Sequence, residues 1–186
     1  MRGSGRKSKK DQADEAARPV PTADQIRERT LQRAIKLLAA RSRSVAELRE
    51  LLLQSRGSDK VAVEEAVSRL REYGYLDDER FAFGFASLKI RQRPLGRQRL
   101  KRDLSMKKVD RAVVDKALDL VYGEVSETEL IDRAIEKRIR VRGRPKNRAQ
   151  AKSLFDHLMR QGFPYELVSE KVRAASQVEL DDNDAV

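Results

Sequence analysis

Two concentrations of lysine and arginine carry the most evident chemistry in this sequence. Ten basic and two acidic residues lie at positions 89–111, and nine basic and one acidic lie at 133–152, so each window has a net charge of +8. The whole chain has a net charge of +11, which leaves the residues outside the two windows net acidic at −5. Ammonium and guanidinium groups bind phosphates and carboxylates. The polarised charge therefore indicates a polyanionic partner, such as nucleic acid or an acidic protein surface.

Within these windows, basic residues recur at helical spacing. In the first window, steps of four residues along one side of a predicted helix connect Arg93, Arg97 and Lys101. In the second window, steps of four, three and four residues connect Arg133, Lys137, Arg140 and Arg144. A solvated helix can show the same spacing, although more acidic residues normally lie between its basic ones. We interpret the two rows as binding surfaces.

Residue types that support catalysis or metal binding are few and isolated. The sequence contains no cysteine and one histidine, which excludes disulfides, thiolate metal sites and thiol catalysis. His157 has no second candidate ligand nearby, so a polar helix surface explains it better than a metal site. Asp77, Asp78 and Glu79 lack a second acidic cluster, and a helix start explains them better than acid–base chemistry. The sequence predicts a protein that is not an enzyme and that has no cofactor and no metal site.

The elements that must position these residues are predicted to be helices. Charged residues make up 38% of the chain, against about 25% in an ordinary soluble domain, and this balance suits thin, solvated helical layers. Pairs with capping-box spacing mark three helix starts: Thr22 with Gln25, Ser44 with Glu47, and Ser126 with Glu129. Gly74 can end a helix in the left-handed conformation, and Asp77 can cap the next helix.

An internal repeat organises these helices. Five apolar positions recur 54 residues further on without a gap: Leu100, Leu104, Val109, Val113 and Leu118 match Leu154, Leu158, Phe163, Leu167 and Val172. Leu48 and Leu52 form a partial third copy, with a few extra residues around 56–59. A further helix precedes each copy, at about 24–40, 78–92 and 127–142. The predicted fold is all-α, with three tandem three-helix repeats in an elongated, curved array.

Two tails of opposite charge are expected to flank the repeats. The first ten residues include five basic and no acidic ones, and the last ten include four acidic ones. We expect a disordered basic tail at 1–22 and a disordered acidic tail at 177–186. The expected repeats lie between them: 23–77, 78–125 and 126–176. No apolar segment resembles a membrane span or a secretory signal, so we expect a cytoplasmic protein without membrane contact.

The residues alone leave more than one function open. A helix, a short turn and a second helix also occur in helix-turn-helix DNA readers. Glu64-Glu65 and Tyr165-Glu166 occupy the starts of two third helices, where carboxylates repel phosphates, so ordinary three-helix packing is preferred to base recognition. A helical protein that binds DNA or RNA directly, and a helical scaffold for another protein, both fit the pattern.

Several segments resemble the bacterial RecX family. The most specific is the run from Gly74 to Ala82, which reads Gly-Tyr-Leu-Asp-Asp-Glu-Arg-Phe-Ala. The other matching segments are Leu37 to Ser44 with Glu47-Leu48, Leu70, Pro94-Leu95-Gly96 ahead of Arg99-Leu100 and Leu104, and Leu158 to Gly162-Phe163. The resemblance covers about residues 26–175, all three predicted repeats. Residues 105–109 depart from it, because the family usually has a Lys-Gly-Ile type of turn there.

The resemblance implies an all-helical regulator of the recombinase RecA. Family members bind the filament that RecA forms on single-stranded DNA, along its helical groove, and generally inhibit its ATPase and strand-exchange activities. They thereby modulate recombination, DNA repair and the SOS response. For this chain the implied partners are the RecA filament and single-stranded DNA, and we expect a monomer.

In the resulting hypothesis, the three repeats lie along the filament groove, and seven basic residues face DNA phosphates or acidic RecA surface. These residues are Arg91, Arg93, Arg97, Lys101, Arg138, Arg140 and Arg144. Bound there, the protein blocks subunit addition or the movements that couple ATP turnover to strand exchange.

Overall fold

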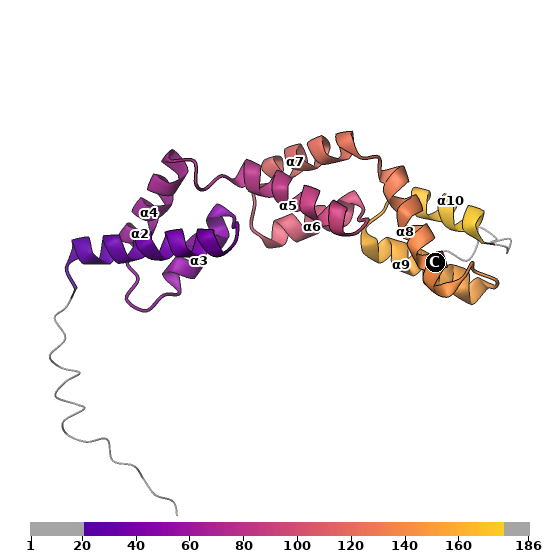
Figure 1. Ribbon diagram of the computed structural model, residues 1–186, viewed down its shortest axis with the longest axis horizontal. Coiled ribbons are helices and arrows are strands. Elements are labelled where there is room, and N and C mark those ends of the chain that lie inside the picture. Colours follow the sequence, from indigo (N-terminus) through magenta and orange to yellow (C-terminus); the bar gives the residue numbers. More distant parts are fainter. Residues whose placement is uncertain (1–20, 177–186) are drawn as a thin grey trace, which may run out of the picture.

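The computed structural model describes residues 21–176, and all regular secondary structure in that range is helical. The helices are α2 (Ala23–Ala40), α3 (Val45–Leu53), α4 (Lys60–Glu72), α5 (Asp78–Gln92), α6 (Arg97–Met106), α7 (Arg111–Glu124), α8 (Glu127–Arg142), α9 (Arg148–Gln161) and α10 (Tyr165–Ala175) (Figure 1). Apart from Pro21 and Thr22, the two predicted tails lie outside the described residues.

The helices form three successive groups of three along an elongated arch (Figure 1). Helices α2, α3 and α4 pack together in the first repeat, α5 and α6 pack on α7 in the second, and α8, α9 and α10 pack together in the third. The prediction of an all-α tandem array is confirmed. Such small units bury little apolar surface individually, so each relies on its neighbours.

Side-chain caps fix most of the helix starts. Thr22 and Ser44 form the predicted capping boxes with Gln25 and Glu47. The third predicted box is wrong, because Ser126 accepts a hydrogen bond from the backbone N–H of Thr128 and Glu129 does not return one. A hydroxyl at this position can satisfy either of two free N–H groups, and sequence spacing does not distinguish them.

The matched apolar positions of the repeat are equivalent in the structure. Leu48, Leu100 and Leu154 are all buried on the middle helix of their repeat. Of the two matched pairs on the third helices, Leu118 and Val172 are buried, whereas Val113 and Leu167 are half-buried because the fully buried positions lie one residue further on, at Val114 and Val168. The turns between these two helices differ in length, and they occupy residues 54–59, 107–110 and 162–164.

The turn after α6 departs from usual backbone geometry. Lys108 has a φ of 57°, a conformation that strongly favours glycine, and it is the only described non-glycine residue with a positive φ. Gly74 also lies in the left-handed region, as predicted, with a φ of 69°. It ends α4, and Asp77 caps α5 by accepting from the N–H groups of Glu79 and Arg80.

The buried apolar residues fall into two clusters. One lies within the first repeat and includes Leu48, Val67 and Leu76. The other runs without interruption from α5 to α10, through the second and third repeats. The second and third repeats therefore share one hydrophobic core, whereas the first repeat has its own.

Candidate nucleic-acid interface

The basic residues of the first window do not lie on one helix. Arg91 is in the last turn of α5, Arg93 caps its C-terminus, and Arg97 is the first residue of α6. The predicted continuous row through Arg93, Arg97 and Lys101 is therefore wrong. Pro94 explains the break, because the residue before a proline is driven out of helical geometry and proline lacks an N–H to donate.

Two of the predicted contact residues already have acidic partners within the protein. The Nη2 atom of Arg97 lies 2.5 Å from Oδ1 of Asp119, and Nζ of Lys101 lies 2.6 Å from Oδ1 of Asp115. The hydrogen bond from Lys101 is the main cause of the lowered pKa of Asp115. Both acids are on α7, so these two bases help to hold α6 against α7.

Arg91 and Arg93 remain open to solvent. Both side chains are exposed, and neither forms an ion pair with another residue in the range 21–176. A surface guanidinium without an internal partner can engage an external phosphate without breaking an existing bond. Of the four predicted residues in the first window, these two have the most freedom to bind a polyanion.

The second window presents its charge more openly. Arg138 is half-buried on α8, while Arg140 in its last turn and Arg144 beyond its end are exposed. Arg144 is not in the helix, because α8 ends at Arg142 and Gly143 follows with a φ of 76°. Among the described residues, none of these three arginines has a carboxylate partner.

The acidic run at the start of α5 has a structural role, as predicted. Asp77 caps the helix, Asp78 accepts a 2.9 Å hydrogen bond from the backbone N–H of Val45, and Glu79 pairs with Lys116 at 2.8 Å. Within residues 21–176, no group of three or more histidine, aspartate or glutamate residues is placed to hold a metal ion. None of the helices in that range is long and apolar enough to cross a membrane.

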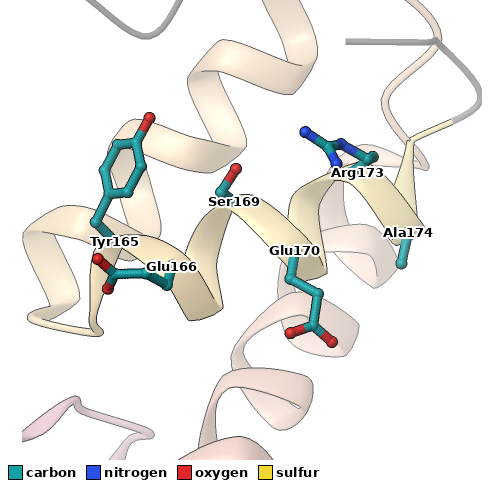
Figure 2. Close-up of a pocket in the computed structure, with 6 residues that line it drawn as sticks. All are labelled: Tyr165, Glu166, Ser169, Glu170, Arg173 and Ala174. Atoms are coloured by element: carbon teal, nitrogen blue, oxygen red, sulfur yellow. The ribbon is translucent and has the colours of Figure 1, made fainter. Parts of the chain in front are cut away.

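A hollow beside α10 differs from the basic surface because two carboxylates, those of Glu166 and Glu170, line it. Its lining residues all come from this one helix, and their side chains diverge: Tyr165 and Ser169 point one way, and Glu170 points away from them (Figure 2). Two carboxylates in an open, divergent hollow do not suit a phosphate or a catalytic site.

Sequence spacing did not single out two arginines that lie close to Arg138. Arg142 is one turn further along α8, and Arg160 is on α9. Both contribute to the lowered pKa of Arg138, although burial is the larger cause. The spacing of four residues between Arg138 and Arg142 indicates from the sequence that they lie on one side of α8. The proximity of Arg160 to Arg138 depends instead on how α9 packs on α8.

These features define a class of protein: tandem three-helix repeats with an open basic surface on the second and third repeats. Residues 77–118 match the family described as "RecX, second three-helix domain". A protein of Chlorobium limicola named "Regulatory protein RecX" is 30% identical over 151 residues, which cover 81% of this chain and 91% of that one. A protein of the same name from Treponema pallidum is 37% identical over 110 residues, covering 59% of this chain and 66% of its own.

Solved structures share the fold. The crystal structure of RecX from Lactobacillus salivarius superposes with a TM-score of 0.70 at 18% identity, and covers 83% of this chain and 98% of that chain. The chain belongs to the RecX family. Its relatives are named as regulatory proteins rather than as enzymes. The matched region spans 66% of the Treponema protein and 52% of a relative from Caldanaerobacter subterraneus.

Proposed function

We propose that this protein binds the filament of RecA on single-stranded DNA and inhibits its ATPase and strand-exchange activities. It thereby modulates recombination, DNA repair and the SOS response, and it acts as a cytoplasmic monomer without enzymatic activity. The observation that carries the proposal is a set of open arginines on the second and third repeats of a RecX-family chain. A filament that repeats the same acidic and phosphate groups along its length is a suitable partner for an elongated array.

The open arginines are expected to make the main contacts. They are the five predicted contact residues that have no carboxylate partner among the described residues: Arg91, Arg93, Arg138, Arg140 and Arg144. Arg97 and Lys101 contribute less in this proposal, because binding a phosphate competes with their ion pairs to Asp119 and Asp115. The bound array spans neighbouring RecA subunits and restrains the movements that couple ATP turnover to strand exchange.

Charge reversal tests this assignment in an assay of RecA ATPase on single-stranded DNA. We expect the quadruple variant Arg91→Glu, Arg93→Glu, Arg140→Glu and Arg144→Glu to lose inhibition by a factor of about 10 or more, as expected when several charge-assisted contacts are lost. Circular dichroism must show unchanged helicity. Full inhibition by the folded variant would remove these residues from the interface.

A matched control changes charge on the first repeat. Arg29, Arg33 and Lys36 on α2 and Arg71 on α4 are exposed and form no ion pair within the described residues. The quadruple variant with Glu at these four positions changes the net charge by the same amount, and it is expected to inhibit RecA nearly as well as the natural chain. Loss of inhibition in this control, equal to that of the test variant, would mean that overall charge matters and not the assigned surface.

The same basic surface also favours a second candidate, direct binding of DNA or RNA without RecA. That function predicts tight binding to naked nucleic acid that weakens steeply with salt. Fluorescence anisotropy with a labelled oligonucleotide, with and without RecA, separates the two. Under the proposal, RecA increases the affinity. Equal affinity in both conditions would favour the second candidate.

A further inference from the structure

The third repeat contains a hollow between the C-terminal half of α8 and the first turns of α9. Its volume is ≈ 280 Å³, and the polar side chains that line it are Arg138, Arg142, Gln150 and Ser153. No carboxylate is among the lining residues. The hollow is therefore bordered by groups that can donate hydrogen bonds, and two of them carry a full positive charge.

Positive charge is concentrated here without an internal counter-charge. Arg138, Arg142 and Arg160 interact electrostatically, and none of them forms an ion pair with another residue in the described part of the chain. Other bases of the protein have a carboxylate partner, as in Arg49 with Glu64 and Lys101 with Asp115. Like charges held close together repel, and an anion bound between them removes that repulsion.

The imidazole of His157 experiences the same charge. It is half-buried on α9, and its pKa is lowered first by burial and then by Arg138, Arg160 and Arg142. The electrostatic causes are all guanidinium groups of the two helices that form the hollow. His157 is therefore kept neutral at physiological pH, and its protonation reports on the positive charge around it.

Hydrogen bonds orient the donors of the hollow. Nη2 of Arg138 donates to Oγ of Ser153 at 3.4 Å, which leaves the Ser153 hydroxyl proton to donate elsewhere. The carbonyl oxygen of the Gln150 side chain accepts from the N–H of Lys146 at 2.8 Å, so its NH₂ group is free to donate. Two guanidiniums, a hydroxyl and an amide NH₂ are a donor set that matches the oxygens of a phosphate.

We infer that this hollow is a phosphate-binding site that takes one phosphate of a single-stranded DNA backbone. The inference rests on the proposed function, since it assigns the third repeat a direct contact with the nucleic acid within the filament. A free nucleotide offers the same phosphate chemistry, and the test separates these two sources. Arg142, Gln150 and Ser153 extend the site beyond the residues predicted from sequence spacing.

The single histidine of the chain makes the site directly observable. The imidazole resonance of His157 is followed by NMR across a pH titration of the full chain, alone and with a dT12 oligonucleotide, ATP or inorganic phosphate. A bound phosphate near the guanidiniums is expected to raise the pKa of His157 by about 1 unit. A rise with dT12 that exceeds the rise with ATP supports the backbone source. A rise with ATP alone overturns it, and no rise with any of the three overturns the site.

Two variants separate the site from general electrostatics. Arg138→Gln with Arg142→Gln, which removes both guanidinium groups that line the hollow, is expected to abolish the response of His157 to saturating dT12. The control, Arg33→Gln with Lys36→Gln, removes the same charge from exposed positions on α2 in the first repeat, and it should keep the response. Equal loss in both variants would show that the response reflects net charge and would overturn the site.

The proposed function and the site fail in different ways. If RecA ATPase is inhibited but His157 does not respond to DNA, the site is wrong and the proposed function stands. If His157 responds to dT12 but RecA ATPase is unaffected, the phosphate site stands without the RecA filament as its setting.

Discussion

The two junctions between successive repeats are built from different interactions. Between the first and second repeats the contacts are polar: Ser44 donates from Oγ to the carbonyl of Lys107 at 2.6 Å, and Lys107 and Lys108 pair with Glu47 and Glu50, both at 2.7 Å. The apolar cores of the two repeats do not merge across this junction. The first repeat is thus attached mainly through hydrogen bonds and ion pairs.

Between the second and third repeats, the two backbones form hydrogen bonds with each other. The N–H of Gly96 donates to the carbonyl of Gln161 at 3.0 Å, and the N–H of Gln98 donates to the carbonyl of Gly162 at 3.2 Å. A Cβ atom at Gly96 would collide with the backbone of Gly162, so only glycine allows this approach. Within the second repeat, next to Gly96, the hydroxyl of Tyr122 donates a hydrogen bond to the carbonyl of Leu95 at 2.8 Å, and burial is the main cause of the raised pKa of that hydroxyl.

The difference between the two junctions suggests that the first repeat and the other two have different roles in binding. The second and third repeats share a core and carry the basic windows, so they present those charges as one rigid surface. The first repeat has a separate apolar core. We therefore expect the array to bind through its rigid part and to adjust to its partner through its first repeat.

The largest expected effect on stability comes from a substitution at the junction between the second and third repeats. Gly96→Ala is expected to lower the free energy of unfolding by about 2 to 4 kcal/mol, because the new methyl group clashes with backbone that cannot rotate away. Urea unfolding followed by circular dichroism measures it. The control is Gly123→Ala on α7, where no atom lies within 4 Å of the new Cβ, and a gain of about 0.5 to 1 kcal/mol is expected.

Removing the central hydrogen bond of the polar junction should have a smaller effect. Ser44→Ala loses the cap of α3 and leaves the Lys107 carbonyl without this donor, so we expect a loss of about 2 kcal/mol in the same assay. Ser126→Ala is the matched control, since it removes a cap without a contact to another repeat, and it should cost about 1 kcal/mol. Equal losses would mean that the bond between repeats contributes little.

Salt should distinguish the two junctions. Raising the ionic strength from 0.1 to 1 M shortens the screening length from about 10 to about 3 Å and weakens the ion pairs of Lys107 and Lys108. The chain contains no cysteine, so engineered cysteines give unique spin labels. The distance distribution between Arg33→Cys and Leu120→Cys should broaden, while that between Leu120→Cys and Ala149→Cys should not. Equal responses would contradict the proposed difference.

The smallest expected effect concerns the strained turn at the polar junction. Lys108→Gly relieves the positive φ, worth about 1 kcal/mol, but removes an exposed ion pair with Glu50, worth about 0.5 kcal/mol. We expect a net gain of about 0.5 kcal/mol in urea unfolding. Lys108→Ala keeps the strain and loses the pair, so it should be less stable than the natural chain. A loss of stability in the glycine variant would show that the ion pair outweighs the strain.

Local sequence signals were sufficient for the fold. The cap at Asp77 and the left-handed Gly74 depend on neighbours within a few positions, and each is found as predicted. The break at Pro94 was also visible in the sequence, but the regular spacing of Arg93 and Arg97 concealed it. The arrangement of the helices in three tandem repeats was inferred from the 54-residue spacing of the apolar positions.

The candidate site was less predictable because its charges depend on tertiary contacts. Arg97 finds its partner 22 residues away on another helix, and Lys101 finds its partner 14 residues away. A helical wheel cannot show either pairing. Likewise, Arg160 reaches the surroundings of Arg138 only because α9 packs on α8. Counts of basic residues indicated a candidate surface, but packing decides which charges lack an internal partner.

Inhibition of RecA at low stoichiometry tests the central claim most directly. The measurement is the ATPase rate of RecA on single-stranded DNA, titrated with this protein far below the RecA concentration. We predict that ATPase activity is lost at these low ratios, because one bound array affects many subunits of a filament. Inhibition that appears only when the DNA itself is saturated would contradict the account and would mean simple competition for the strand.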